Sequence, residues 1–280
     1  MQSTNEYTLP VFSVSASVIS DPGCVRETNE DNGRHVTPFA RDLEDSHGTL
    51  TIIADGMGGH NSGEVASQMA IDLISRSFYA DVEGSIPDRL ERAIQNANSE
   101  INAAAMADRK YFGMGTTVVA LVLHGDVGYC AHIGDSRLYR LRDEEMDLLT
   151  MDHSQVMEMV KQGILTFDQA QDHEDKNIIL RAVGTQPFVE VEMSEPFDVK
   201  PDDEFLLCSD GLCDMVRSEE IREIWITTAQ IHSTVEQLID LAKLRGGTDN
   251  ITVAVVRVSA RAQTQVAKIV PVTRETKVQR

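Results

Sequence analysis

The sequence predicts an α+β fold built from mostly antiparallel sheets with helices on their outer faces. Apolar runs of strand length recur along the chain, and several are separated only by short turns. Helical segments with one apolar face lie between these runs, without the regular alternation typical of a parallel sheet. Because no low-complexity linker interrupts residues 11–258, we expect a single domain there.

The predicted strands are runs rich in apolar and β-branched residues. His124-Gly125-Asp126 and Gly134-Asp135-Ser136 each lie between two such runs and are typical of hairpin turns. The predicted strands cover Val11–Ser20, Thr49–Ala54, Thr116–His124, Val127–Ile133, Arg137–Arg142, Glu190–Phe197, Glu204–Ser209 and Ile251–Val258.

The longer predicted helices repeat apolar residues every three or four positions. One covers Gly63–Tyr79, and a second begins after Ser85, a residue type favoured at a helix N-cap. A third begins at the capping box Ser233-Thr234-Val235-Glu236 and ends at the glycine pair Gly246-Gly247.

The polar stretch 154–183 interrupts the series of strands. It predicts two short helices, which begin at Ser154 and Thr166. We interpret the stretch as an insertion into the core fold and not as a second domain. Outside the predicted domain, residues 1–10 form a polar extension, and residues 259–280 lack periodicity, so we expect a flexible basic tail.

Composition and charge exclude several classes of protein. The 280 residues are 41% hydrophobic and 25% charged, which is ordinary for a globular protein and unlike a disordered or fibrous chain. The formal net charge is −20, and because residues 261–280 are basic, the remainder carries about −24. Such an acidic body repels nucleic acids and anionic membrane surfaces, so we expect it to bind neither.

No segment of the sequence is expected to enter a membrane. The longest apolar stretch, Val118–Leu123, is far shorter than the ~20 residues that span a bilayer. The N-terminus lacks the basic and apolar regions of a signal peptide. The four cysteines form no CxxC pair, which favours reduced thiols in a cytoplasmic protein.

Aspartates stand where apolar strands begin or end, and this feature recurs along the chain. Any one Asp-Gly pair after a strand is most often only a turn. The loop Gly56–Gly63 could instead cradle a phosphate, but Asn61 takes the place of the third glycine in the G-x-G-x-x-G pattern. Because converging carboxylates repel one another and oxygen clusters suit Mg2+ or Mn2+, the recurrence favours a divalent metal site. The segments concerned are 26–31, 51–60, 132–137, 206–214 and 246–251.

Seven short motifs follow one another along the chain. They are Arg-x-x-Asn-Glu-Asp at 26–31, Asp-Gly-Met-Gly-Gly-His at 55–60, Gly-Met-Gly-Thr-Thr at 113–117, Gly-Asp-Ser-Arg at 134–137, Asp-His-Ser at 152–154, Ser-Asp-Gly-Leu at 209–212 and Gly-Gly-x-Asp-Asn at 246–250. With these motifs in this order, the chain resembles the metal-dependent protein phosphatases of type 2C, the PPM family, in their bacterial form. The resemblance covers about residues 13–258.

The resemblance implies more about the fold than the strand and helix patterns do. It implies a sandwich of two antiparallel sheets packed face to face, with helices on both outer faces and a metal site at one edge. It also implies that residues 154–183 form a flap beside that site. In this family the flap affects the choice of substrate.

The resemblance also assigns metal ligands. Asp55 would bridge two Mn2+ or Mg2+ ions, with the carbonyl of Gly56 as a further ligand, and Asp210 and Asp249 would complete the first ion. The remaining acids of the motifs would hold coordinated waters or a third, weaker ion. Glu30 and Asp31 are the expected water-holding residues, and Asp135 and Asp214 the expected ligands of the third ion.

The same resemblance implies how the reaction proceeds. Two ions ~3.5–4 Å apart can activate a bridging hydroxide for in-line attack on phosphorus, so that no covalent enzyme intermediate is needed. Arg26 would bind the substrate phosphate through its guanidinium group. Eukaryotic members carry a proposed acid, a histidine, where this chain has Met57, so His60 becomes the candidate general acid, with a loop histidine facing solvent as the alternative.

Two residues near the motifs have structural interpretations. His153 is interpreted as a hinge or cap residue at the start of the flap. Cys208 is interpreted as a buried strand residue and not as a reactive thiol.

The expected function is hydrolysis of phosphoserine and phosphothreonine on proteins, in opposition to a bacterial Ser/Thr kinase. A regulatory module of the same fold without catalysis is a second interpretation, which the retained aspartates disfavour. A different metallohydrolase, such as a nuclease, is a third, which the acidic charge disfavours. Because family members with only this domain are often monomers, we expect a monomer.

Overall fold

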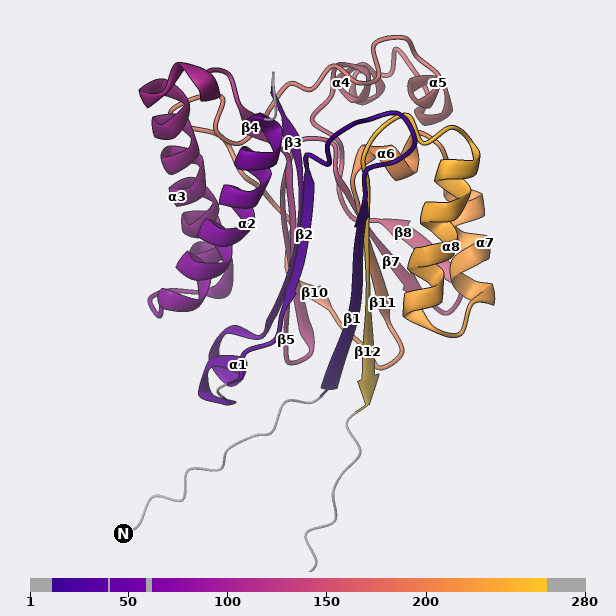
Figure 1. The fold of residues 1–280 in the computed structure, drawn as a ribbon. Helices are drawn as coiled ribbons and strands as arrows, with labels where there is room; N and C mark the ends of the chain where they lie inside the picture. Colours follow the sequence, from indigo (N-terminus) through magenta and orange to yellow (C-terminus); the bar gives the residue numbers. More distant parts are fainter. Residues whose placement is uncertain (1–11, 40, 59–61, 261–280) are drawn as a thin grey trace, which may run out of the picture.

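Two antiparallel sheets lie at the centre of the structure, a computed structural model that describes residues 12–39, 41–58 and 62–260 (Figure 1). The five-stranded sheet has the order β1-β12-β11-β7-β8. Its strands are β1 (Phe12–Asp21), β7 (Arg137–Arg142), β8 (Glu145–Leu148), β11 (Glu204–Cys208) and β12 (Ile251–Ala260). Of the predicted flexible tail, Ser259 and Ala260 belong instead to β12, where they pair with β1. The predicted N-terminal extension, residues 261–280 and His60 lie outside the described residues.

The second sheet has seven strands. Its main path runs β10-β6-β5-β3-β2, with β4 paired to β3 and β9 paired to β6. The strands are β2 (Asp31–Val36), β3 (Thr49–Met57), β4 (Gly115–Thr116), β5 (Val118–His124), β6 (Val127–Ile133), β9 (Glu192–Met193) and β10 (Phe197–Asp198).

The inner faces of the two sheets pack against each other and form one apolar layer. Ile53 and Val119 from one sheet lie in this layer with Phe205 and Val256 from the other, and all four are fully buried. Neighbouring residues such as Ile52 point to the opposite face and are buried there against helices. Both faces of these strands are therefore buried, which explains their continuous apolar runs.

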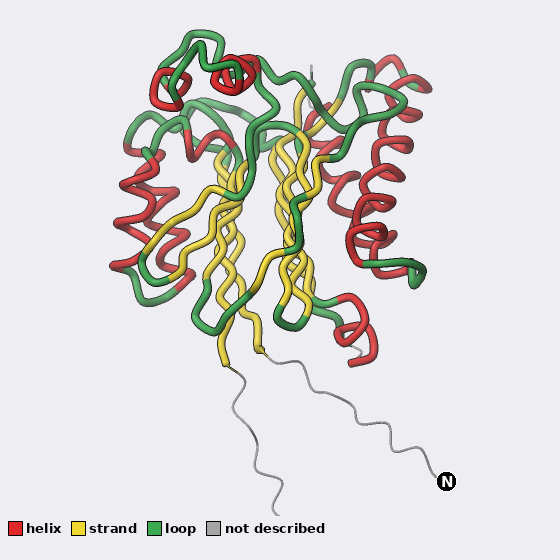
Figure 2. Tube along the Cα trace, turned by 180° about the vertical axis from the view of Figure 1, so that it is seen from behind, coloured by secondary structure: helices red, strands yellow, loops and turns green. Residues whose placement is uncertain are grey.

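Helices cover the outer face of each sheet, so the molecule has four layers, as the views in Figures 1 and 2 show. On the seven-stranded side lie α2 (Ser62–Ala80) and α3 (Ile86–Ala107), and on the other α6 (Asp210–Cys213), α7 (Ser218–Thr227) and α8 (Ile231–Leu244). The chain also forms α1 (Arg41–His47) and the short 3-10 helix η1 (Arg109–Tyr111). The predicted sandwich is confirmed.

Local capping interactions position the helices that the sequence marks most clearly. The Ser85 side chain accepts the backbone N–H of Asp88, whose carboxylate in turn accepts the N–H of Ser85. In the flap, Ser154 caps α4 (Gln155–Lys161) and Thr166 caps α5 (Phe167–Gln171). A small apolar cluster around Met157 joins these two helices above one edge of the sandwich (Figure 1).

Several predicted boundaries are wrong for identifiable reasons. In place of the predicted strand 190–197 there are two short strands, β9 and β10, because Pro196 has no N–H to donate and the N–H of Cys130 donates to the side-chain hydroxyl of Ser194. The last long helix begins at Ile231 and not at Ser233. Its first turn closes with a bond from the N–H of Thr234 to the carbonyl of Gln230.

Six elements escape prediction, two of them because they clearly depend on tertiary contacts. The strand β2 contains polar residues and one glycine, yet it pairs along its whole length with β3. The helix α7 has four apolar residues among its ten, of which Ile221 and Trp225 are buried against the core. The remaining four are α1, η1, β8 and α6.

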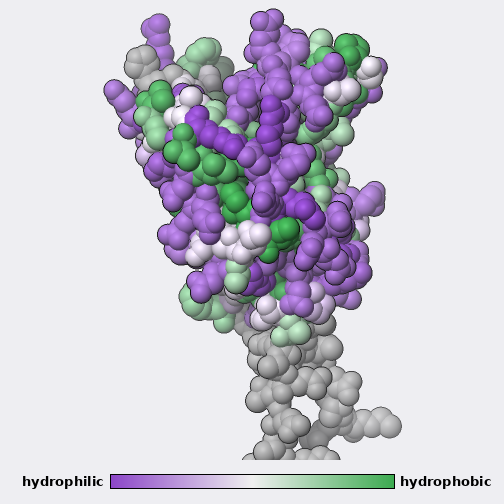
Figure 3. Space-filling view, turned by 90° about the vertical axis from the view of Figure 1, so that its right-hand side faces the viewer, coloured by the Kyte–Doolittle hydropathy of each residue, from purple (hydrophilic) through white to green (hydrophobic). Residues whose placement is uncertain are grey.

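No helix among the described residues is long and apolar enough to cross a membrane. The face beside α7 and α8 is mainly hydrophilic, with a few separate hydrophobic areas (Figure 3).

Candidate metal centre

Aspartates from both sheets meet at the edge of the sandwich that lies below the flap. Asp55 lies near the end of β3, and Asp31, its partner in register, begins β2. Asp210 begins α6 directly beyond β11, and Asp249 precedes β12. The antiparallel pairing of β11 with β12 brings the end of one strand beside the start of the other. The fold thus assembles acids that are up to about 220 residues apart in the sequence.

The carboxyl groups of this cluster raise one another's pKa. Burial raises the pKa of Asp55 and of Asp210 well above the usual range, and the neighbouring acids raise both further. Burial likewise raises the pKa of Asp31 to about 6, although the Ser209 hydroxyl donates a 2.7 Å hydrogen bond to it. Burial also raises the pKa of Asp135, which is 6% exposed, to about 7. The protein itself therefore supplies too little positive charge to balance this cluster.

Two carboxylate oxygens in the cluster have no hydrogen-bond partner in the described part of the chain. The Oδ1 atoms of Asp135 and Asp210 are buried and accept no hydrogen bond from the residues that the structure describes. Leaving buried polar atoms unpaired costs free energy, which oxygen-binding cations such as Mg2+ or Mn2+ would offset. The residues present therefore fit divalent ions.

The spacing of the acids bears on how such ions would be held. Among the described residues, no three of the aspartate oxygens lie within 4.8 Å of one another. One ion could not take all its ligands from three of these side chains in this arrangement. The spacing leaves room for water in the coordination shell, which Mg2+ commonly keeps.

Backbone packing at Gly56 fixes the turn beside Asp55. The Gly56 N–H donates to the carbonyl of Glu30 at 3.1 Å. A Cβ atom at Gly56 would lie 2.1 Å from the carbonyl oxygen of Gly63, so no other residue type fits without a shift of backbone. Thr117 binds Asp55 twice, because its N–H donates to the Asp55 carbonyl and its hydroxyl accepts the Asp55 N–H.

Arg26 and Glu30 border the cluster on the side of β1. The Nη2 of Arg26 donates to Oδ2 of Asp249 at 2.7 Å, and the Arg26 side chain is 52% exposed. Burial raises the pKa of Glu30, while a hydrogen bond from the Gly63 backbone lowers it. The structure thus brings Arg26, which the resemblance assigns to phosphate binding, against a predicted metal ligand.

A cavity connects the acids with the flap. Its lining includes Asp135, Asp210 and Asp214 from the core and Lys176 and Asn177 from the flap. The Lys176 ammonium group lies 2.8 Å from Oδ1 of Asp214. The flap is therefore placed to contact whatever occupies this part of the site.

A family assignment follows from comparison with known proteins. The sequence pattern described as "Protein phosphatase 2C" matches residues 39–245. The chain belongs to this family.

Relatives of known identity agree with this assignment. The chain is 38% identical to the serine/threonine phosphatase stp of Listeria innocua over 242 residues, which cover 85% of this chain and 93% of that protein. The crystal structure of the Mycobacterium tuberculosis serine/threonine phosphatase PstP/Ppp is similar, with a TM-score of 0.78, 35% identity, and coverage of 88% of this chain and 99% of that one. A PstP catalytic domain in complex with two manganese ions gives a TM-score of 0.77 at 34% identity, covering 89% and 99%. The predicted family is confirmed.

Within this phosphatase 2C chain, a buried ion pair lines the same cavity as Asp135 and Asp210 of the candidate metal centre. The guanidinium of Arg137 donates to both carboxylate oxygens of Asp152, at 2.7–3.2 Å. Their side chains are only 10% and 8% exposed. Both residues belong to recognised motifs, but the sequence contains no signal that they pair, because 14 residues separate them.

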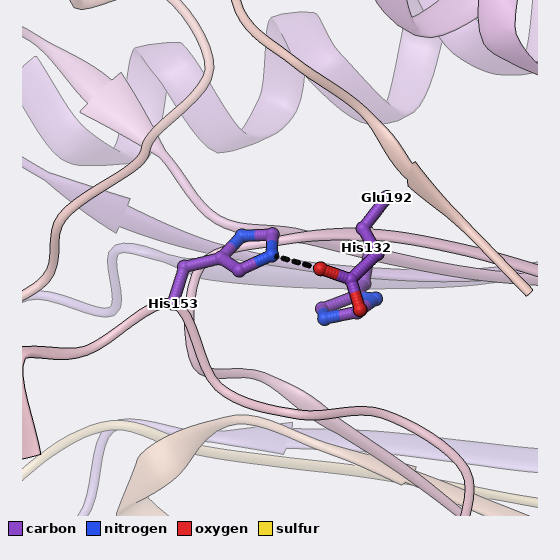
Figure 4. A group of neighbouring side chains, drawn as sticks. All are labelled: His132, His153 and Glu192. Atoms are coloured by element: carbon purple, nitrogen blue, oxygen red, sulfur yellow. Dashed lines mark hydrogen bonds and ion pairs between the residues drawn. The ribbon is translucent and has the colours of Figure 1, made fainter. Parts of the chain in front are cut away.

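His132, His153 and Glu192 form a second compact cluster, which is not suited to a metal ion as it stands (Figure 4). Their ligand atoms lie within 4.8 Å of one another, and the imidazole rings stack with centroids 4.7 Å apart. Nδ1 of His153 accepts the N–H of Gly134, so Nε2 carries the proton and donates to the Glu192 carboxylate at 2.9 Å. His153 then has no free lone pair for a metal, and the cluster instead fixes the turn that precedes Asp135.

Proposed function

We propose that this chain is a serine/threonine protein phosphatase that hydrolyses phosphoserine and phosphothreonine on proteins with Mn2+ or Mg2+. The observation that carries the proposal is the cluster of acids with buried, unpartnered oxygens in a member of the protein phosphatase 2C family. The two manganese ions of the similar PstP domain support the choice of cofactor. The relationship to the Listeria phosphatase supports the reaction.

The acids of the cluster would hold the ions. Asp55, the Gly56 carbonyl, Asp210 and Asp249 would hold two ions, with Asp55 common to both. Because no three of these aspartates among the described residues offer oxygens within 4.8 Å of one another, the side chains would have to draw together around the ions. When bound, such ions supply an activated water for in-line attack and neutralise charge on the phosphoryl group. The raised pKa of Asp55 supports this assignment, because a bound cation would relieve the repulsion that keeps it high.

Acids at the margin of the cluster would have secondary roles. Asp31 and Glu30 would hold coordinated waters, and Asp31 is already oriented by the hydroxyl of Ser209. Asp135 and Asp214 would bind a third, weaker ion beneath the flap, where both line the cavity.

Arg26 would bind the phosphate of the substrate. Its one hydrogen bond to Asp249 uses Nη2, and because the side chain is half-exposed, the remaining guanidinium donors can face a ligand. Two parallel N–H donors match two phosphoryl oxygens, which orients the phosphorus for attack from the opposite side.

The leaving serine or threonine oxygen needs a proton. His60 is the proposed donor, on the sequence alone, because it ends the glycine loop beside Asp55. If His60→Ala left turnover and its pH profile unchanged, this role would be withdrawn.

The proposed substrates are phosphorylated proteins, and the proposed counterpart is a bacterial Ser/Thr kinase. A monomer is proposed as the active form. A catalytically silent module of the same fold is the alternative, and the presence of Asp55, Asp210 and Asp249 together at one edge speaks against it.

Phosphate release from a phosphothreonine peptide, with Mn2+ and with EDTA, tests the proposal. We expect metal-dependent release by the wild type and a loss of at least about a hundredfold in Asp210→Asn. Asp240→Asn, the same change on the exposed face of α8, is the matched control and should keep full activity. Phosphate release that is unchanged by EDTA, or that Asp210→Asn retains at the wild-type rate, would contradict the proposed site.

A further inference from the structure

Two cysteines lie in contact beside the proposed metal centre. Cys208 ends β11 and Cys213 ends α6, and their Sγ atoms are 3.4 Å apart. Both are free thiols. The segment between them contains Asp210, and Asp214 follows directly. A change in the positions of the two cysteines would therefore also move Asp210 and Asp214, two of the proposed metal ligands.

The two thiols differ in access. Cys208 is fully buried, whereas Cys213 is partly exposed and lines the cavity that also contains Asp210 and Asp214. A small molecule that enters the cavity therefore reaches Cys213 before Cys208. The Cys213 sulfur lies 3.5 Å from the Tyr139 hydroxyl, and the residue otherwise packs against an apolar cluster.

We propose that Cys213 and Cys208 are an oxidation site for hydroperoxides, which convert the pair to a disulfide and thereby weaken metal binding at the neighbouring acids. The effect on the acids rests on the function proposed above. The oxidation itself does not.

The chemistry balances with a hydroperoxide, such as hydrogen peroxide, as the oxidant. The Cys213 sulfur attacks one oxygen of hydrogen peroxide, the O–O bond breaks, and the cysteine becomes a sulfenic acid. The other oxygen leaves as hydroxide and takes up the thiol proton to form water. The Cys208 sulfur then attacks the Cys213 sulfur, the S–O bond breaks, and a second water carries away the hydroxyl group and the Cys208 proton. Both cysteines are oxidised by one electron each, and the peroxide is reduced by two.

Tight packing around α6 would transmit the effect of the disulfide to the proposed metal site. A disulfide bond is about 2.05 Å long, so the two sulfurs must approach by more than 1 Å from their present contact. The helix α6 has no room to follow freely, because a Cβ at Gly211 would lie 2.0 Å from the carbonyl oxygen of Asn250. Asn250 in turn binds the backbone of Thr28 and Glu30. A shift of α6 therefore disturbs Asp210 and the segment that carries Glu30.

The other two cysteines supply internal controls. Cys24 is exposed and its sulfur contacts a backbone carbonyl, while Cys130 is buried in the layer between the sheets. Neither lies beside a second thiol among the cysteine contacts of the described residues. Peroxide is expected to modify Cys24 without forming an intramolecular bond.

The test uses the full chain with Cys24→Ser as the background. It is treated with hydrogen peroxide, mapped by peptide mass, and titrated with Mn2+ by calorimetry before and after reduction with dithiothreitol. We expect loss of two thiol hydrogens in a peptide that links Cys208 to Cys213, and a fall in Mn2+ affinity of about tenfold that dithiothreitol reverses. Cys213→Ser should show neither change, and Cys208→Ser should yield a sulfenic acid on Cys213 that dimedone traps.

The outcomes separate this inference from the proposed function. Absence of the Cys208–Cys213 link in the oxidised Cys24→Ser background overturns the inference, whether or not the further serine variants fold. A disulfide that leaves Mn2+ affinity unchanged overturns the coupling to the acids. Failure of the reduced protein to bind Mn2+ at all would instead refute the proposed function, because it appears before any oxidation.

Discussion

At the scale of single residues, the metal centre depends on partners that the sequence places far away. The hydroxyl of Ser209 orients Asp31, and Thr117 holds both the N–H and the carbonyl of Asp55. Residues of the motifs thus divide into acids that would hold the ions and neighbours that fix their positions. Changes at the second group should alter stability, and changes at the first should alter metal binding.

The buried pair Arg137–Asp152 gives a test of the positioning group. Asp152→Ala leaves the Arg137 guanidinium buried without its partner, so the free energy of unfolding should fall by about 3–5 kcal/mol. Asp147→Ala, which breaks the more exposed pair with Arg140, should cost at most about 1 kcal/mol. Urea denaturation in EDTA measures both, and equal losses in the two variants would contradict the account.

His35 gives a pH-dependent test away from the metal centre. Burial lowers the pKa of His35 to about 4, and both ring nitrogens bond threonine hydroxyls, Thr51 and Thr37. Between this value and the usual 6.5 the unfolded chain binds more protons, so stability is complete above about pH 6.5 and falls as the pH drops toward 4. His35→Gln should remove up to about 3 kcal/mol of this acid-side loss, since each pKa unit between about 4 and 6.5 is worth about 1.4 kcal/mol.

The matched control for His35 is His232→Gln, because His232 is exposed on α8. Denaturation at pH 7 and at pH 4.5 measures the acid-side loss of stability in both variants. If His35→Gln behaved like the control, burial of His35 would not be the source of the effect.

At the scale of elements, periodicity predicts the buried strands and long helices well because they bury a continuous apolar face. The helix after Ser85 and the two flap helices begin where their caps predict. The strand β2 and the helix α7 were missed because their stability comes from pairing and packing with distant elements. The acids were found through motifs, but their convergence depends on strand register, which no local pattern encodes.

The ammonium group of Lys176, a residue of the flap, lies at the proposed third ion site. Lys176 binds Asp214 in the present arrangement, and an ammonium group there competes with a metal ion. Lys176→Gln should therefore raise the affinity of the weaker Mn2+ site by up to about fivefold, the equivalent of a partly exposed ion pair worth about 1 kcal/mol. Calorimetry with Mn2+ measures this change. The matched control is Lys161→Gln, on the exposed surface of α4, which should leave Mn2+ affinity unchanged. If Lys176→Gln bound Mn2+ more weakly than the wild type, the lysine would assist metal binding and would not compete with it.

At the scale of the whole molecule, the sandwich concentrates acids at one edge of a chain that already carries a net charge of −20. Mutual repulsion at this edge opposes folding of the metal-free protein, as the raised pKa values of Asp55 and Asp210 indicate. Divalent ions would convert the same edge from a destabilising to a stabilising feature. Stability and activity should therefore depend on metal together.

Thermal unfolding makes this coupling measurable. In EDTA, Asp210→Asn should melt at a higher temperature than the wild type, because one charge is removed from the cluster. With Mn2+ the order should reverse, because the wild type gains more stability from binding. A variant that is less stable than the wild type in EDTA would show that Asp210 stabilises the fold without metal.

The central claim is that the acids at this edge, and not the neighbouring histidines, hold the metal ions. Anomalous X-ray scattering from crystals grown with Mn2+ tests it most directly. We predict manganese peaks beside Asp55, Asp210 and Asp249 and none between His132, His153 and Glu192, whose tautomers leave His153 no free lone pair. A peak at the histidine cluster with none at the aspartates would contradict the account.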